Sequence, residues 1–253
     1  ARSVAALTGQ PFVAGFGAGT PEFTEYVRGV RFASPTTFME EYLTAVRGLL
    51  NEGHVRLAGR YHNIDFGLGR MEHAPVEVGG AVLRPGMARV VGRAGDVAIT
   101  WMTPPRYVAD VLVPNLALGA EQAGRAQRPR VATVVHAALE REGRDPYRLA
   151  ELAASGHLAQ PHYAAMLRDA GVPVDPADPE AGARALVNLG VYVFGSAADV
   201  AAALADWPPF DEVCERFTNG LGAAAAGGAV ALKTIAAYRC GLDLPAPEQA
   251  AAR

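Results

Sequence analysis

The chain has 253 residues, of which 50% are hydrophobic and 19% are charged, and its formal net charge is −3. This length is sufficient for one sizeable core and matches the usual size of a single barrel domain, so we expect residues 1–253 to form one domain. Lys233 is the only lysine and the arginines are scattered. No basic patch therefore indicates binding to nucleic acid or to an anionic membrane surface.

Cysteine usage and the apolar runs indicate a cytoplasmic protein. Cys214 and Cys240 cannot form a disulfide framework, and their apolar surroundings favour buried thiols. No apolar run approaches the ~20 residues of a membrane span. No signal peptide opens the chain, because residues 1–3 lead directly into an amphipathic segment.

The first elements are the end of a helix and a short strand. Ala1–Leu7 has the pattern of the last turns of a helix, and Phe12–Phe16 is an apolar strand that runs into glycines 15, 17 and 19. Thr37 with Glu40 predicts a capping box that opens a helix, which ends near Asn51–Gly53. The apolar face of that helix has helical spacing and comprises Phe38, Tyr42, Val46, Leu49 and Leu50.

The middle of the chain alternates strands with helices. Gly59–Ala74 is predicted to be a looser stretch, and Val76–Val78 a strand that ends in Gly79–Gly80. Pro85 suits the first turn of a helix that reaches about Gly92. The elements predicted next are a strand over 96–101, a helix over 107–123 and a strongly β-branched strand over 131–139.

The last part of the chain is predicted to be mostly helical. Helices are expected over 146–170 and 180–189, and Ser196 with Asp199 caps a further helix over 197–205. A strand over 211–217 and an Ala-rich helix over 223–238 close the chain. Strand and helix alternate about five times, which favours a parallel α/β sheet or barrel and leaves both architectures open.

Two glycine clusters lie at strand ends, at 15–20 and at 78–81. Glycine lets a backbone approach a ligand, and free N–H groups at a helix start bind phosphate. A tight turn explains each cluster equally well. Neither is a dinucleotide fingerprint or a Walker A loop, since Pro21 stands where a helix would begin and no Gly-Lys-Ser/Thr follows. Thr20 would add a hydroxyl donor, while Glu22 is either a solvated acid or a partner for a cofactor hydroxyl.

Several other side chains have both a structural and a functional interpretation. His136 lies near the end of a predicted strand, which in a barrel faces the active site, and a core histidine is as good an explanation. Trp101 and Met102 either line a substrate pocket or belong to the core. Tyr61 and His62 lie in a loop that either covers the site or decorates the surface. We assign no metal, because the histidines lack metal-ligand spacing, and no nucleophilic hydrolase chemistry, because Gly-x-Ser-x-Gly is absent.

Phe12–Thr20 resembles the fourth-strand signature of the luciferase-like monooxygenases, which are (β/α)₈ barrels. Further segments resemble that family in the same order, at 40–50, 59–61, 75–80, 83–96, 119–125 and 161–167. Because the resemblance begins at the fourth strand, the first three βα units are absent, and with them the family's catalytic residues. We expect a missing N-terminal segment, since residues 1–7 begin in mid-helix; completion by another chain and a degenerate barrel are the alternatives.

The resemblance implies a cofactor and a reaction class. Ile99–Pro104 resembles the branch that uses the deazaflavin coenzyme F-420. In that branch backbone at the ends of the fourth and fifth strands holds the phosphate, which corresponds here to Gly17, Gly19, Thr20, Gly79, Gly80 and Ala81, with Glu22 as a further candidate. The implied function is hydride transfer between the deazaflavin and a small organic substrate by a homodimer. The alternatives are an FMN-dependent monooxygenase and a non-catalytic flavin-binding or partner subunit.

Overall fold

The computed structural model describes residues 1–29, 31–205 and 232–233. The described residues fall into two compact units. The first comprises Ala1–Trp101 with Asp110–Thr133, and the second comprises Met102–Ala109 with the described residues from Val134 onward. The single domain expected from the sequence stays a prediction. Among the described helices, none has the length and apolarity needed to cross a membrane.

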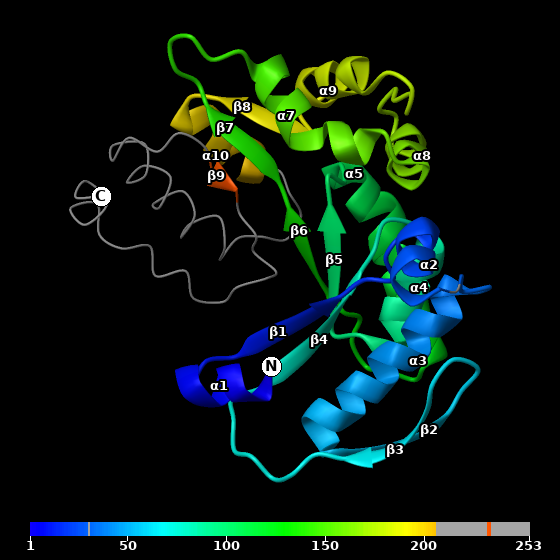
Figure 1. The fold of residues 1–253 in the computed structure, drawn as a ribbon. Coiled ribbons are helices and arrows are strands. Elements are labelled where there is room, and N and C mark those ends of the chain that lie inside the picture. The colour runs from blue at the N-terminus through cyan, green and yellow to red at the C-terminus, as the bar shows by residue number, and fades with distance from the viewer. Residues whose placement is uncertain (30, 206–231, 234–253) are drawn as a thin grey trace. The chain divides into compact units, whose positions relative to one another are not determined.

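The first unit contains a sheet in which strand order follows chain order (Figure 1). The strands are β1 (Phe12–Phe16), β4 (Val76–Ala81), β5 (Val97–Trp101) and β6 (Arg130–Val134), in the order β1-β4-β5-β6. β4 pairs in parallel with both β1 and β5, and Gly15 lies opposite Gly79. This arrangement confirms the predicted parallel α/β class.

The two faces of this sheet carry different neighbours. On one face Gly80 lies against Val91 of α4 (Pro85–Ala94) and Leu43 of α3 (Pro35–Arg47). α6 (Val113–Gln122) packs in turn on α4. On the other face a small apolar cluster joins β1, β5 and β6, and its members are Val13, Val97, Ile99 and Ala132. The remaining helical segments of chain 1–112 are α1 (Arg2–Thr8), α2 (Pro21–Arg28), η1 (Gly48–Glu52), α5 (Pro105–Tyr107) and η2 (Val108–Leu112).

Two elements of the first unit differ from the prediction. The stretch expected to be a loop contains an antiparallel hairpin, β2 (His54–Ala58) and β3 (Asn63–Gly67). The segment after Thr20, for which no helix was predicted, forms α2. α3 begins at Pro35 and not at Thr37, because the Ser34 side chain accepts a hydrogen bond from the Thr37 N–H at 3.3 Å and is the N-cap.

The second unit contains a sheet of β7 (His136–Leu139), β8 (Tyr192–Gly195) and β9 (Leu232–Lys233) in the order β8-β7-β9. β7 is parallel to β8 and antiparallel to β9. The strand predicted over 131–139 is therefore two strands, β6 and β7, which belong to different sheets. β8 was not predicted, and β9 contradicts the predicted closing helix at residues 232–233.

Four helices lie among the described residues from 134 to 205, and most were predicted. They are α7 (Pro146–Leu158), α8 (Pro161–Asp169), α9 (Pro179–Asn188) and α10 (Ala197–Ala205). α7 and α8 were expected as one helix, but Pro161 begins a new one. The predicted cap of α10 is confirmed, since the Asp199 N–H donates to Ser196 Oγ at 3.2 Å and the Ser196 N–H donates to Asp199 Oδ2 at 3.0 Å. The strand predicted over 211–217 and both cysteines lie outside the described residues.

Candidate functional site

The predicted cofactor residues gather at the carboxyl ends of β1 and β4. Gly15 pairs with Gly79 and Phe16 with Gly80, so the residues that follow leave the sheet side by side. A Cβ atom built on Gly17 would lie 3.3 Å from the Cβ of Ala81. The two glycine clusters, 60 residues apart in sequence, therefore form one continuous backbone surface at this edge of the sheet.

The turn after β1 needs glycine for its backbone conformation. Gly19 has a φ angle of 71°, in the left-handed region that side chains disfavour. A Cβ atom there would also lie 3.2 Å from the ring of Phe23. The segment Gly17–Gly19 consequently presents bare backbone to any ligand at the sheet edge.

Thr20 and Glu22 have structural roles that the sequence did not separate from cofactor binding. Thr20 is the N-cap of α2, and its Oγ1 accepts a hydrogen bond from the Phe23 N–H at 3.1 Å. The next residue, Pro21, has no N–H. The carboxylate of Glu22 is 70% exposed and lies 3.9 Å from Arg31. Because Thr20 already caps α2 and Pro21 has no N–H, the start of α2 offers fewer free donors than an uncapped helix start.

Gly79 and Gly80 lie within β4 and not in a turn after it, so the predicted end of this strand at Val78 is wrong. Their lack of a side chain has a packing explanation. A Cβ atom on Gly79 would lie 2.7 Å from Ile99 Cδ1, and one on Gly80 would collide with Val91. Both residues are buried, and only Ala81 at the end of the strand is exposed.

The helix start at Pro85 was predicted from the sequence, but its candidate role as an anion site beside this edge was not. α4 begins at Pro85, and its N-cap residue, Arg84, makes no side-chain cap hydrogen bond. The first turn of a helix without such a cap presents unsatisfied N–H groups and the positive end of the helix dipole. The signal was present in the sequence, because no Ser, Thr, Asp or Asn precedes Pro85. Gly86 and Met87 in this turn follow Ala81 closely in the chain.

The three predicted substrate-pocket residues fall in both units. Trp101 ends β5 in the first unit and is partly exposed. Met102, in the second unit, is buried, with a φ angle of 52°. His136 is also buried in the second unit and begins β7, so the interpretation that placed it near a strand's end is wrong. The pocket they were predicted to share stays a prediction.

Tyr61 and His62 are fixed to α3 by a buried carboxylate. Glu41 accepts backbone hydrogen bonds from Arg60 at 2.6 Å, Tyr61 at 2.8 Å and His62 at 2.9 Å. Burial raises the pKa of Glu41, but these three hydrogen bonds, together with the interaction with the His62 side chain, outweigh it and leave the pKa below its ordinary value. The His62 ring lies 4.8 Å from the Phe38 ring. This hairpin tip is consequently part of the packing around α3.

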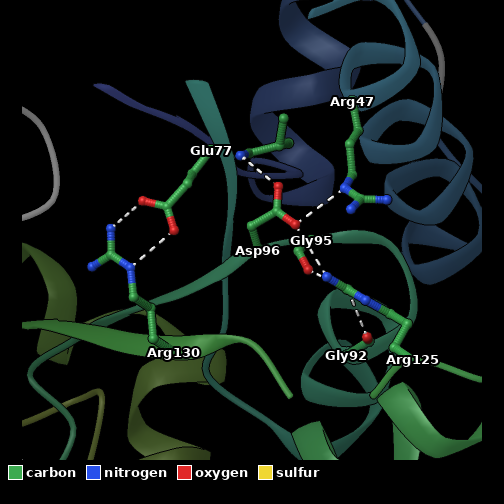
Figure 2. Close-up of polar contacts among 8 residues, drawn as sticks. Arg47, Glu77, Gly92, Gly95, Asp96, Arg125 and Arg130 are labelled. Atoms are coloured by element: carbon green, nitrogen blue, oxygen red, sulfur yellow. Dashed lines mark hydrogen bonds and ion pairs between the residues drawn. The ribbon is translucent and has the colours of Figure 1, made fainter. Parts of the chain in front are cut away.

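A polar cluster lies at the opposite, amino ends of the strands (Figure 2). Asp96 accepts hydrogen bonds from Arg47 at 3.0 Å, from Arg125 at 3.0 Å and from the Val78 N–H at 3.1 Å. Arg125 also donates to the carbonyl oxygens of Gly92 and Gly95. In barrels the amino-terminal end of the strands serves stability and the carboxyl end carries the site. We therefore regard this cluster as structural.

Parallel strands that feed helices, with glycines near the carboxyl ends of β1 and β4, define an α/β protein. The sequence matches the family described as luciferase-like monooxygenase over residues 4–208, and the chain belongs to this family. Its fold is that of the family's (β/α)₈ barrels. A search of curated proteins found no match.

Solved structures with the same fold include F-420-dependent enzymes and a monooxygenase. An F-420-dependent secondary alcohol dehydrogenase in complex with an F-420–acetone adduct is 18% identical, with a TM-score of 0.55 over 86% of this chain and 72% of that chain. A coenzyme F-420-dependent tetrahydromethanopterin reductase from Methanopyrus kandleri is 16% identical, with a TM-score of 0.56 over 81% and 67%. An EDTA monooxygenase from Chelativorans is also 16% identical, with a TM-score of 0.52 over 89% and 76%. Among the described residues, no group of three or more His, Cys, Asp or Glu side chains could hold a metal ion.

Proposed function

We propose that this chain is a coenzyme F-420-dependent oxidoreductase that transfers a hydride between the deazaflavin and a small organic substrate. The observation that carries the proposal is the adjacency of Gly17 and Ala81 at the carboxyl edge of the parallel sheet. Likeness to two F-420-dependent enzymes supports the choice of cofactor. We further propose that it acts as a homodimer in the cytoplasm.

The residues at this edge fit a phosphate-bearing group. The backbone of Gly17–Gly19 and of Ala81 offers N–H donors without side chains in the way, and the uncapped start of α4 adds positive potential. In the proposal Thr20 donates its hydroxyl hydrogen while its oxygen caps α2, and Glu22 meets a cofactor hydroxyl. Gly79 and Gly80 act indirectly, because their packing fixes the end of β4.

The bound deazaflavin would supply a hydride donor or acceptor at its C5 position. The protein's part is to anchor the phosphate, orient the ring and exclude water. We propose a substrate-contacting role for Trp101, for Met102 and for His136, each within its own unit. No catalytic acid or base is assigned.

The alternative is an FMN-dependent monooxygenase, and the likeness to an EDTA monooxygenase supports the monooxygenase activity of this alternative. The two functions differ in their use of dioxygen. An FMN-dependent monooxygenase consumes oxygen with its reduced flavin, whereas a deazaflavin enzyme does not.

The test is a fluorescence titration of the purified chain with coenzyme F-420 and with FMN. We expect F-420 to bind more tightly than FMN, and Gly17→Ala to weaken that binding about tenfold, because the added methyl group stands between the backbone and the phosphate. The matched control is Gly69→Ala, since a Cβ atom at Gly69 meets nothing within 4 Å.

Equal affinities of Gly17→Ala and Gly69→Ala for F-420 would show that the phosphate does not bind at Gly17. Tighter binding of FMN, together with oxygen consumption, would show that the cofactor is FMN and not the deazaflavin. Failure to bind either cofactor would leave a non-catalytic member of the family.

A further inference from the structure

A separate cleft lies on the helix side of the end of β1, between β1, α2 and α3. Its volume is about 220 Å³. Phe16 forms part of its wall and contacts Tyr42 of α3, so the cleft lies on the face of β1 that packs against this helix. Gly17 and Ala18 form its edge toward the glycine turn. The cleft shares Gly17 and Ala18 with the site proposed above, and its other lining residues lie outside that site.

The wall of the cleft is aromatic and uncharged. The Phe32 and Phe38 rings stack with their centroids 3.9 Å apart, and Phe16 meets Tyr42 edge to face at 5.2 Å. The hydroxyl of Thr24, which also lines the cleft, already donates to the carbonyl oxygen of Pro21 at 2.9 Å. Among the described residues that line the cleft, none carries a charge. Such a lining suits an uncharged, apolar ligand.

Burial changes sharply from the base of the cleft to its mouth. At the base Met39 is 1% exposed and Phe38 is 7% exposed, whereas at the mouth Phe23 is 60% and Val27 is 59% exposed. The base is therefore part of the close-packed core. The mouth consists of apolar surface that a ligand would remove from water, at about 25 cal/mol per Å².

We propose that this cleft binds an uncharged aromatic or alicyclic molecule of one or two rings. The volume lies below the ~300–1,000 Å³ of pockets for larger ligands, which limits the size of the occupant. Aromatic rings on several sides favour a flat, apolar ligand over a flexible polar one. Because the ligand would touch Gly17 and Ala18, its binding is linked thermodynamically to any ligand of the Gly17–Gly19 turn. The proposal stands independently of the cofactor assignment.

The experiment is a calorimetric titration of the cofactor-free chain with indole as an uncharged two-ring probe. Val27→Trp fills the mouth and Val27→Asp places a charge there, so each should weaken indole binding about tenfold or more. Tyr26 lies on the same helix and is 90% exposed, yet it does not line the cleft. Tyr26→Trp and Tyr26→Asp are the matched controls and should leave the affinity within about twofold of the parent chain.

Thermal unfolding of all four variants should match the parent chain, because both positions are exposed. Indole affinity that is insensitive to both Val27 variants, or no indole binding at all, would overturn the proposal. A dimer that Tyr26→Asp and Val27→Asp both dissociate would also overturn it, by identifying this face as an interface between two copies of the chain. Titration with F-420 in the presence and absence of indole then measures the linkage.

Discussion

Asp96 joins three parts of the first unit through a single carboxylate. Its side chain is 19% exposed and binds Arg125, which is 20% exposed, and Arg47, which is 44% exposed. It also holds the Val78 N–H within the sheet. Removing one member of a largely buried set leaves the other charges without compensation, and this costs more than the net contribution of the pair.

We expect Asp96→Ala to lower the free energy of unfolding by about 3 kcal/mol, measured by urea denaturation. Arg47→Met should cost about 1 kcal/mol or less, because that guanidinium is largely solvated. Equal effects of the two substitutions would show that the buried bonds of Arg125 and Val78 contribute little.

Glu41 should make stability depend on pH. The pKa of this carboxyl is lowered in the folded chain, so the unfolded chain binds the proton more readily. Its contribution is present in full above the unfolded pKa of about 4.3 and is lost as the pH falls through the folded value. We expect Glu41→Gln to be less stable near neutral pH and to lose less stability on acidification.

The measurement for Glu41 is urea denaturation at a series of pH values between about 3 and 7. Glu121→Gln, at an exposed position, should leave the pH profile of the parent chain unchanged. A Glu41→Gln profile parallel to that of the parent chain would contradict the assigned role of the three backbone hydrogen bonds.

The structural roles of individual residues were predicted less well than the strands and helices to which they belong. Gly17, Gly79, Gly80 and Ala81 were expected at the ends of two strands. Those strands pair in parallel, but Gly79 and Gly80 lie within β4 and lack side chains because of the bulk of Ile99 and Val91. A sequence does not show which side chain faces a glycine across two strands. The cap of α3 was misplaced for a similar reason, since Ser34 and Thr37 are both suitable capping residues and only the position of Pro35 distinguishes them.

At the scale of elements, α4 and α6 pack with their backbones in direct contact. A Cβ atom on Gly92 would collide with the carbonyl oxygen of Leu116, and one on Gly119 would collide with that of Arg89. Two helices approach this closely only where neither has a side chain at the crossing point. The two glycines therefore set the separation of the helices.

We expect Gly119→Ala to lower the free energy of unfolding by about 2 kcal/mol, although alanine favours helix by about 1 kcal/mol over glycine. Gly156→Ala in α7 is the control, because a Cβ atom there meets nothing within 4 Å. It should stabilise the chain slightly. Chemical denaturation of both variants distinguishes the two effects, and stabilisation by Gly119→Ala would refute the close crossing.

Helices and strands with strong apolar periodicity were predicted within a few residues, whereas short amphipathic elements were missed. β2 alternates exposed with partly buried residues and has no fully buried position. α2 has exposed Phe23, Tyr26 and Val27, so its apolar residues did not mark a core-facing stripe. β6 and β7 follow each other with only Val135 between them, and a β-branched run does not show where a chain leaves one sheet.

At the scale of the whole molecule, the parallel α/β class followed from the alternation of elements, and the barrel family from the order of several modest motifs. The function of individual side chains did not follow in the same way. The candidate phosphate edge uses backbone atoms, which every residue possesses, so a sequence can indicate this edge only through glycines and helix starts. The helix from Pro85 was predicted, but its start was overlooked as a candidate anion site, because such a start is marked only by the absence of a capping residue.

Cofactor binding should be measurable as an increase in stability of the chain. A ligand that binds only the folded state at 100 times its dissociation constant adds about 2.7 kcal/mol to the free energy of unfolding. We expect coenzyme F-420 to raise the unfolding temperature by several degrees, and FMN at the same concentration to raise it less. Calorimetry over a range of concentrations checks this, and equal shifts would remove the preference for the deazaflavin.

Ile99 spans two strands, with its Cδ1 atom 2.6 Å from a Cβ built on Gly15 and 2.7 Å from one built on Gly79. The side chains at positions 15, 79 and 99 therefore compete for the same space. A larger side chain at one of these positions requires a smaller one at another. Alanine at position 15 or 79 should be tolerated only where residue 99 has been shortened, so that each single change is harmful and the pair is not. Among natural relatives, residue size at 99 should then vary inversely with residue size at the two glycine positions.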